Sequence, residues 1–177
     1  MPRPARVKHS RLYGNLFLPL ITATFVFAKA EEGSAPNQWP QWRGPLGTGE
    51  APLGNPPLTW SEDKNVRWKT KLPGKGHSTP VVWGNNVFLT ATIATGKKLP
   101  VPDQPKGAHN NLDPTHKLSF LVIGIDFVKG TILWQKEVRL SQPHQSTHES
   151  GTWASASPVT DGERVYAFFG SNGLYCL

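Results

Sequence analysis

The sequence has 177 residues, with 19 Lys and Arg against 12 Asp and Glu, a formal net charge of +7 and one cysteine. A single cysteine excludes an intrachain disulfide, and no Cys or Cys/His spacing typical of a zinc site is present. The 17 Gly, 17 Pro and seven Trp indicate short strands joined by many turns.

Residues 1–30 have the pattern of a Sec-type signal peptide. A cationic stretch without acidic residues, 3–11, precedes an apolar run from Leu16 to Ala28, and Ala28-Lys29-Ala30 supplies a small-x-small cleavage site. The alternative is a membrane anchor, but the apolar run is about 13 residues long and a spanning helix needs about 20. We therefore expect this segment to be cleaved on export.

The positive charge belongs mostly to that leader. Five of the basic residues lie in residues 1–30, so the remainder carries 14 basic and 12 acidic residues. No basic patch is left that would favour nucleic acid as a partner. No cysteine lies near the cleavage site to carry a lipid anchor, and we expect a periplasmic or secreted product without a membrane span.

Residues 31–65 are rich in Pro and Gly and have no hydrophobic period, which predicts an extended arm. Trp39, Trp42 and Trp60 are costly to leave in water, so we expect the arm to lie against a folded surface. A disordered linker is the alternative, although such linkers rarely carry so many aromatic residues.

The first strand-like segments follow the arm. Residues 66–70 alternate apolar and polar side chains, as in a half-buried strand. Residues 78–83 and 86–92 predict a hairpin with a tight turn at Gly84-Asn85. Residues 94–116 predict a long polar loop. Its length is unusual for a compact domain, which marks it as either functional or mobile.

The second half of the chain repeats this alternation of strands and turns. Residues 118–126 and 131–138 are expected to pair around a turn in which Asp126 bonds the turn amides and Gly130 takes a positive φ. A polar loop over 141–151 separates these strands from three more, which are predicted over 154–160, over 164–169 and from 174 onward. No helical stripe follows residue 30, so the sequence predicts an all-β fold.

Two segments of the chain are internal repeats. Residues 78–88 align without a gap on residues 156–166. In both, a proline opens a strand, a glycine makes a turn and a Val-aromatic pair opens the next strand. The matched pairs are Pro80 with Pro158, Gly84 with Gly162, Val87 with Val165 and Phe88 with Tyr166.

The joined pattern resembles the repeat of pyrroloquinoline-quinone (PQQ) dehydrogenase propellers and of the lipoprotein that assists outer-membrane β-barrel assembly. A second similarity, between residues 66–69 and 132–136, supports it. In that family each repeat is a four-stranded antiparallel blade of about 40 residues. The resemblance implies a partial β-propeller over residues 66–177, with about two blades, an insertion at 94–116 and further blades expected beyond this N-terminal fragment. A β-sandwich is the alternative.

The resemblance leaves the function open between enzyme and scaffold. PQQ dehydrogenases stack the quinone on a Trp, bind Ca²⁺ through carboxylates and amides, and use an Asp as base, but no acidic residue here matches those positions. His144, His148 and Glu149 are good metal ligands in type, yet Pro143 indicates a loop on which they would not converge. We assign no catalytic residue, no metal ligand and no cofactor, and PQQ and Ca²⁺ enter only with the oxidoreductase alternative.

Loops before the innermost strands line one mouth of a propeller in that family. His77, His148 and Trp153 are therefore the candidates for a ligand-facing rim, although Trp153 also suits packing between blades. Cys176 is expected to be a buried thiol. The leading hypothesis is a non-catalytic binding or scaffold module with a protein or carbohydrate partner, and the alternative is the N-terminal part of a PQQ-dependent oxidoreductase.

Overall fold

The computed structural model describes residues 38–103 and 110–177, so the predicted signal peptide lies outside the described residues. The described chain forms antiparallel sheets, and its one helical element is a short 3-10 turn, η2 (Gly170–Asn172). The prediction of an all-β fold is confirmed. Within these residues no helix is long and apolar enough to cross a membrane.

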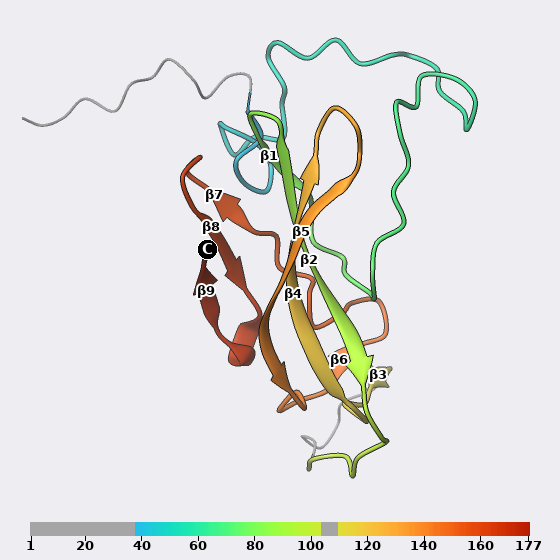
Figure 1. Cartoon of the computed structure of the whole chain (residues 1–177), viewed down its shortest axis with the longest axis vertical. Coiled ribbons are helices and arrows are strands. Elements are labelled where there is room, and N and C mark those ends of the chain that lie inside the picture. Colours follow the sequence, from blue (N-terminus) through green and yellow to red (C-terminus); the bar gives the residue numbers. More distant parts are fainter. Residues whose placement is uncertain (1–37, 104–109) are drawn as a thin grey trace, which may run out of the picture. The chain divides into compact units, whose positions relative to one another are not determined.

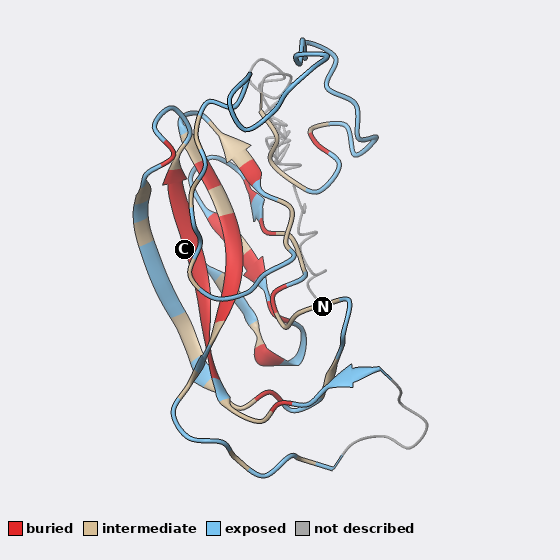
Figure 2. Ribbon diagram, turned by 90° about the vertical axis from the view of Figure 1, so that its right-hand side faces the viewer, coloured by how far each residue is buried: buried red, intermediate tan, exposed pale blue. Residues whose placement is uncertain are grey.

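The first sheet has four strands in the order β1-β2-β4-β5, shown at the centre of Figure 1. The strands are β1 (Val81–Trp83), β2 (Asn86–Thr95), β4 (Lys117–Asp126) and β5 (Ile132–Ser141), and all neighbours are antiparallel. This is the arrangement expected for one propeller blade. β4 is buried along nearly its whole length, whereas no residue of the outer strand β5 is buried (Figure 2).

Local turn chemistry joins these strands as predicted. Gly84 has φ +57° in the β1–β2 turn, and Trp83 pairs with Asn86 across it. In the β4–β5 turn, Asp126 Oδ1 accepts hydrogen bonds from the amides of Val128 (2.8 Å) and Lys129 (2.7 Å). Gly130 closes that turn at φ +73°, a conformation that glycine adopts without steric cost.

The second sheet contains the strands β7 (Val159–Thr160), β8 (Val165–Phe168) and β9 (Leu174–Cys176) in sequential order. Its first hairpin reproduces the first hairpin of the other sheet. Val81 pairs with Phe88, and 78 positions later Val159 pairs with Tyr166. The identical register confirms that the two aligned segments are structural repeats, and the second sheet has the first three strands of a blade.

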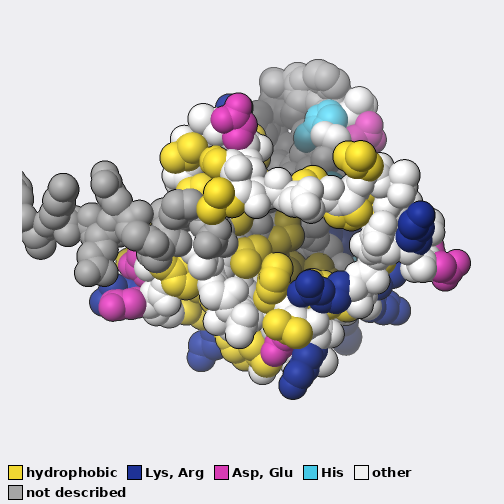
Figure 3. Space-filling view, turned by 90° about the horizontal axis from the view of Figure 1, so that it is seen from above, with side chains coloured by type: hydrophobic (Ala, Val, Ile, Leu, Met, Phe, Trp, Pro, Cys, Tyr) yellow, Lys and Arg dark blue, Asp and Glu magenta, His cyan; other side chains and the backbone are white. Residues whose placement is uncertain are grey.

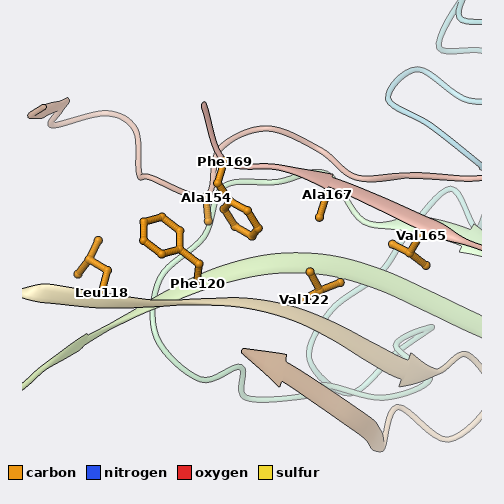
Figure 4. Packing of buried hydrophobic residues seen from close by; sticks show 7 residues of the cluster. All are labelled: Leu118, Phe120, Val122, Ala154, Val165, Ala167 and Phe169. Carbon is orange, nitrogen blue, oxygen red and sulfur yellow. The ribbon is translucent and has the colours of Figure 1, made fainter. Parts of the chain in front are cut away.

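A core of apolar side chains fills the space between the two sheets (Figure 4). The side chains that β4 contributes alternate along the strand, because successive residues of a strand point to opposite faces. Phe120 meets Phe169 edge to face, with ring centroids 5.3 Å apart. The buried members of this cluster are Leu118, Phe120, Val122, Ala154, Val165, Ala167 and Phe169.

The opposite face of the first sheet carries a second buried cluster. β2 contributes Val87, Leu89 and Ala91 to it. The intervening residues of β4, Leu121, Ile123 and Ile125, complete it. β4 is therefore buried on both faces, as expected for a central strand of a blade that has neighbours on both sides.

Two indole rings lie directly on glycine turns. A Cβ atom built on Gly162, in the β7–β8 turn, would be 2.4 Å from the ring of Trp83 at the end of β1. A Cβ atom on Gly130 would be 2.5 Å from the ring of Trp68. The Trp83 contact joins the two sheets at their first hairpins, since each residue belongs to the equivalent hairpin of a different repeat.

The described part of the arm meets the inner strands of both sheets. Trp39 and Val82 exchange two backbone hydrogen bonds of 2.9 and 2.8 Å, and Gly84 N donates to Gln38 Oε1 at 2.7 Å. Thr160 N of β7 donates to Pro40 O at 2.9 Å. Residues 38–40 thus lie beside the inner edge of the first sheet and reach the second.

The expectation that all three arm tryptophans lie against a folded surface is wrong for two of them. Trp42 and Trp60 are 63% and 69% exposed. Their segment is held mainly by its own turns, in which Arg43 stacks on Trp42 at 5.6 Å. The end of the molecule viewed in Figure 3 accordingly has apolar side chains at its surface, with charged side chains around them.

The prediction of a strand at residues 66–70 is also wrong. These residues pair with no other strand. Their hydrogen bonds to the rest of the chain are made by side chains and not by the backbone. Trp68 Nε1 donates to Phe127 O at 2.9 Å, and Thr70 Oγ1 donates to Gly130 O. The alternating pattern therefore reflects docking on the β4–β5 turn and not a ladder.

The two predicted loops, 94–116 and 141–151, each contain a short strand, and each begins later than predicted. β2 continues through Thr95 and β5 through Ser141, so each takes residues that were expected in a loop. Between them, β3 (Asn111–Leu112) pairs with β6 (Thr147–His148). Cys176 is exposed, contrary to expectation, because it lies on the outer strand β9.

Candidate functional site

A cavity of about 460 Å³ opens beside the first sheet, toward the end at which β3 and β6 lie. Four parts of the chain build it: the segment before β1, the end of β2, the β3–β4 region and the loop that leads to the second repeat. The lining residues are Gly74, Lys75, His77, Thr92, Ile93, Ala94, Leu112, Leu118, Glu149, Gly151, Thr152 and Trp153.

The segment before β1 is held close to β2 by glycine. Lys75 exchanges two backbone hydrogen bonds with Thr92, of 2.9 and 2.7 Å. A Cβ atom at either flanking residue, Gly74 or Gly76, would be 2.2 Å from a carbonyl oxygen of β2. Only glycine permits this approach, which fixes the backbone position of Lys75 and His77 at the cavity.

Trp153 is fixed by the loop in which it stands. Its indole Nε1–H donates to Gln145 O at 2.9 Å. A tight turn follows, in which Ser155 Oγ accepts from Thr152 N (2.8 Å) and donates to Thr152 O (2.8 Å). Trp153 packs against the inter-sheet core, as expected for packing between blades, and it also lines the cavity.

The insertion between β2 and β4 forms one wall of the cavity through Leu112. Besides the β3–β6 pairing, Glu149 N donates to Asn110 O at 2.8 Å, and Ser146 Oγ donates to Asp113 Oδ1 at 2.9 Å. Residues 110–113 of the insertion are thereby tied to the loop that carries Glu149 and Trp153.

The structure brings two of the three predicted rim residues, His77 and Trp153, to the same cavity. His148 does not line it, since its Nδ1 is 2.7 Å from Ser150 Oγ and its backbone belongs to β6. Whether these residues bind a ligand stays a prediction. Lys75 and Glu149 also stand at the cavity, although neither is among the predicted rim residues and Glu149 was considered only as a metal ligand. The only sequence signal for Lys75 is its pair of flanking glycines.

Three side chains at the cavity are exposed and unpaired. Among the described residues, the side chains of Lys75, His77 and Glu149 take part in no hydrogen bond or ion pair. They supply a cationic donor, an imidazole and an anionic acceptor. The remaining lining is mainly apolar, so the cavity combines an apolar floor with a few polar groups, as small-molecule sites do.

Comparison with known proteins identifies the family. The family model for the PQQ-like repeat, described as outer membrane protein assembly factor BamB, matches residues 55–177. The chain belongs to this family. No curated protein and no solved structure gives a significant match.

The family name raises the question of whether the described residues suit PQQ and its calcium ion. No group of three His, Cys, Asp or Glu side chains among residues 38–103 and 110–177 is placed to hold a metal ion. His144 Nδ1 instead lies 3.1 Å from Ser171 Oγ, and His144 does not line the cavity. The described residues therefore supply no cluster of such side chains for a calcium ion, and we derive no redox step from them.

The clearest electrostatic perturbation lies in the β7–β8 turn. The backbone N–H of Arg164, 2.7 Å from Asp161 Oδ1, is the main cause that lowers the pKa of Asp161 below its ordinary value. Burial acts in the opposite direction, while the Glu163 N–H and the Tyr166 hydroxyl add to the lowering. The hydrogen bond to Asp161 raises the pKa of Tyr166. None of these groups lines the cavity. Their hydrogen bonds join residues within the β7–β8 hairpin, so they stabilise the turn.

Proposed function

We propose that this chain is a non-catalytic binding module of an exported β-propeller protein, and that it holds a protein or carbohydrate partner through the cavity beside its first sheet. The observation that carries the proposal is the set of unpaired polar side chains, Lys75, His77 and Glu149, over an apolar floor. Because these side chains make no hydrogen bond or ion pair among the described residues, they are available to bind a partner in the cavity.

The position of the cavity supports a binding role. Its lining combines the segment before β1 with the loop that precedes the second repeat, and loops of this kind vary more freely than the sheets that position them. The proposal places the module in the periplasm or cell envelope, on the strength of the leader pattern in residues 1–30 and the family description.

The test begins with export. The full chain is produced in a bacterial host, and the product is expected in the periplasmic fraction with a mass that shows cleavage after Ala30. An uncleaved cytoplasmic product would overturn the localisation.

Binding is then measured by surface plasmon resonance against purified envelope polysaccharide and purified envelope protein fractions. We expect binding that falls at least tenfold in the double variant Lys75→Ala/Glu149→Ala and is unchanged in Lys129→Ala, an exposed lysine in the β4–β5 turn. Equal binding by wild type and by the double variant, or no binding to either fraction, would overturn the proposal. Dye-linked alcohol oxidation by the chain supplied with PQQ and Ca²⁺ would favour the oxidoreductase alternative instead.

A further inference from the structure

The chemistry of the cavity narrows the class of ligand that it suits. Its volume of about 460 Å³ lies within the range of about 300–1,000 Å³ for small-molecule sites. This is room for one or a few ring-sized units and not for a folded protein surface. The ligand must therefore be a small molecule or the end of a chain.

The floor requires an apolar surface on the ligand. Ile93, Leu112 and Leu118 provide aliphatic surface, and Trp153 adds an indole ring. Because the indole N–H is already bound to Gln145 O, Trp153 offers the cavity apolar ring surface and no further donor. An aromatic face favours stacking on a flat apolar surface.

The polar side chains exclude ligands that are apolar throughout. Covering Lys75, His77 and Glu149 with hydrocarbon would remove water from three groups that have no partner among the described residues. Burial of an unpaired polar or charged group is unfavourable. The ligand must therefore carry hydrogen-bonding groups at its edge.

The mixed signs of these side chains disfavour a ligand that carries charge of one sign only. An anion that pairs with Lys75 is repelled by Glu149, and a cation that pairs with Glu149 is repelled by Lys75. A hydroxyl group both donates and accepts, so several hydroxyl groups satisfy an ammonium, a carboxylate and an imidazole together.

We propose, on the basis of the binding role proposed above, that the cavity binds a neutral saccharide unit, with its apolar ring face on Trp153 and its hydroxyl groups on Lys75, His77 and Glu149. A ring of this kind meets all three requirements, because its C–H groups form an apolar face and its hydroxyl groups lie around the edge. An apolar peptide side chain meets the first requirement and fails the second.

Three disaccharides that differ in charge test the ligand class by isothermal titration calorimetry with the full chain. N,N′-diacetylchitobiose is neutral, chitobiose is its cationic diamine, and a disaccharide of uronic acid is anionic. A neutral glycan array extends the search beyond this one linkage. We expect at least one neutral glycan to bind, with its amine or uronic acid counterpart at least tenfold weaker.

Two charge-neutralising variants give a readout that a folding defect would not produce. Lys75→Gln removes the repulsion of a cation, so it is expected to reduce the difference in affinity between neutral and cationic glycans. Glu149→Gln is expected to reduce the difference in affinity between neutral and anionic glycans. Lys129→Gln is the matched control and is expected to leave both differences in affinity unchanged. Trp153→Phe keeps a stacking face and is expected to retain binding, while Trp153→Ala loses it.

Several results would overturn this inference. They are no neutral glycan bound on the array, equal affinity for charged and neutral forms, or a difference in affinity between them that neither Lys75→Gln nor Glu149→Gln changes. If an envelope protein fraction binds through Lys75 and Glu149 but no neutral glycan competes with it, the saccharide inference fails and the binding role stands. If neither fraction nor glycan binds, both fail.

Discussion

Replacing Gly162 by alanine tests the contact that joins the two repeats. Gly162 has φ +94° in the β7–β8 turn, and a Cβ atom there would be 2.4 Å from both Cε2 and Nε1 of Trp83. Carbon atoms in contact are normally about 3.5–4.0 Å apart. The new methyl group therefore requires the indole ring or the turn to move by about an ångström.

The expected loss of stability has two parts. A non-glycine residue in the left-handed region costs about 1–2 kcal/mol, and inserting a methyl group into a packed contact costs about 1–3 kcal/mol. Gly162→Ala should thus lower the free energy of unfolding by about 2–5 kcal/mol, a large part of the ~5–15 kcal/mol typical of a domain. The melting temperature should fall by on the order of 10 °C.

Urea unfolding of the full chain, followed by circular dichroism, measures the difference. Gly84→Ala is the control, because Gly84 makes the equivalent turn of the first repeat at φ +57° with no atom within 4 Å of a Cβ. It should lose only the backbone part, about 1–2 kcal/mol. If Gly162→Ala is no more destabilising than Gly84→Ala, the packing of Trp83 on the neighbouring repeat is not what joins the sheets there.

Three further predictions concern the core, the β7–β8 turn and the outer strands. Phe120→Ala should cost about 3–5 kcal/mol in urea unfolding because Phe120 is fully buried between the sheets, whereas Phe168→Ala, at a residue 51% exposed, should cost much less; equal costs would contradict the assigned core. The lowered pKa of Asp161 contributes stability that is present above the pKa of the unfolded chain and is lost as pH falls through the folded-state pKa. Wild type should therefore lose melting temperature relative to Asp161→Asn below about pH 4, and parallel curves would refute this linkage. Within the described residues β5 and β9 each pair on one side only, so residues 31–177 should self-associate in sedimentation velocity, and Leu174→Lys on β9 should reduce it; a monodisperse monomer would contradict the edge argument.

The elements that the sequence predicted well are those set by neighbouring residues. The hairpin at Gly84-Asn85 and the turn made by Asp126 and Gly130 depend on local backbone preferences and on side-chain bonds within four residues. The 78-residue repeat was equally visible, because the same turn chemistry imposes the same register twice.

The wrong predictions concern pairing and burial, which depend on the elements that pack against a segment in the folded chain. Residues 66–70 have the alternation of a strand, but Trp68 docks on a turn almost sixty residues away and its neighbours find no ladder. Trp42 is a large apolar side chain of the kind usually packed in a fold, yet it is exposed to solvent. Cys176 is exposed because β9 is an outer strand. Alternation and hydrophobicity report a preference for burial, and only a neighbouring element satisfies that preference.

The amino-acid sequence by itself determined the β class, the turns, the repeat and the candidacy of His77 and Trp153, because each follows from residues close together in the chain. The tertiary structure decided the cavity. Lys75 and Glu149 are 74 positions apart and reach the same hollow only because glycine lets one segment lie on β2 while β6 ties the other loop to β3. Which polar side chains are left without a partner is a property of the folded chain, since it depends on every neighbour that packing supplies.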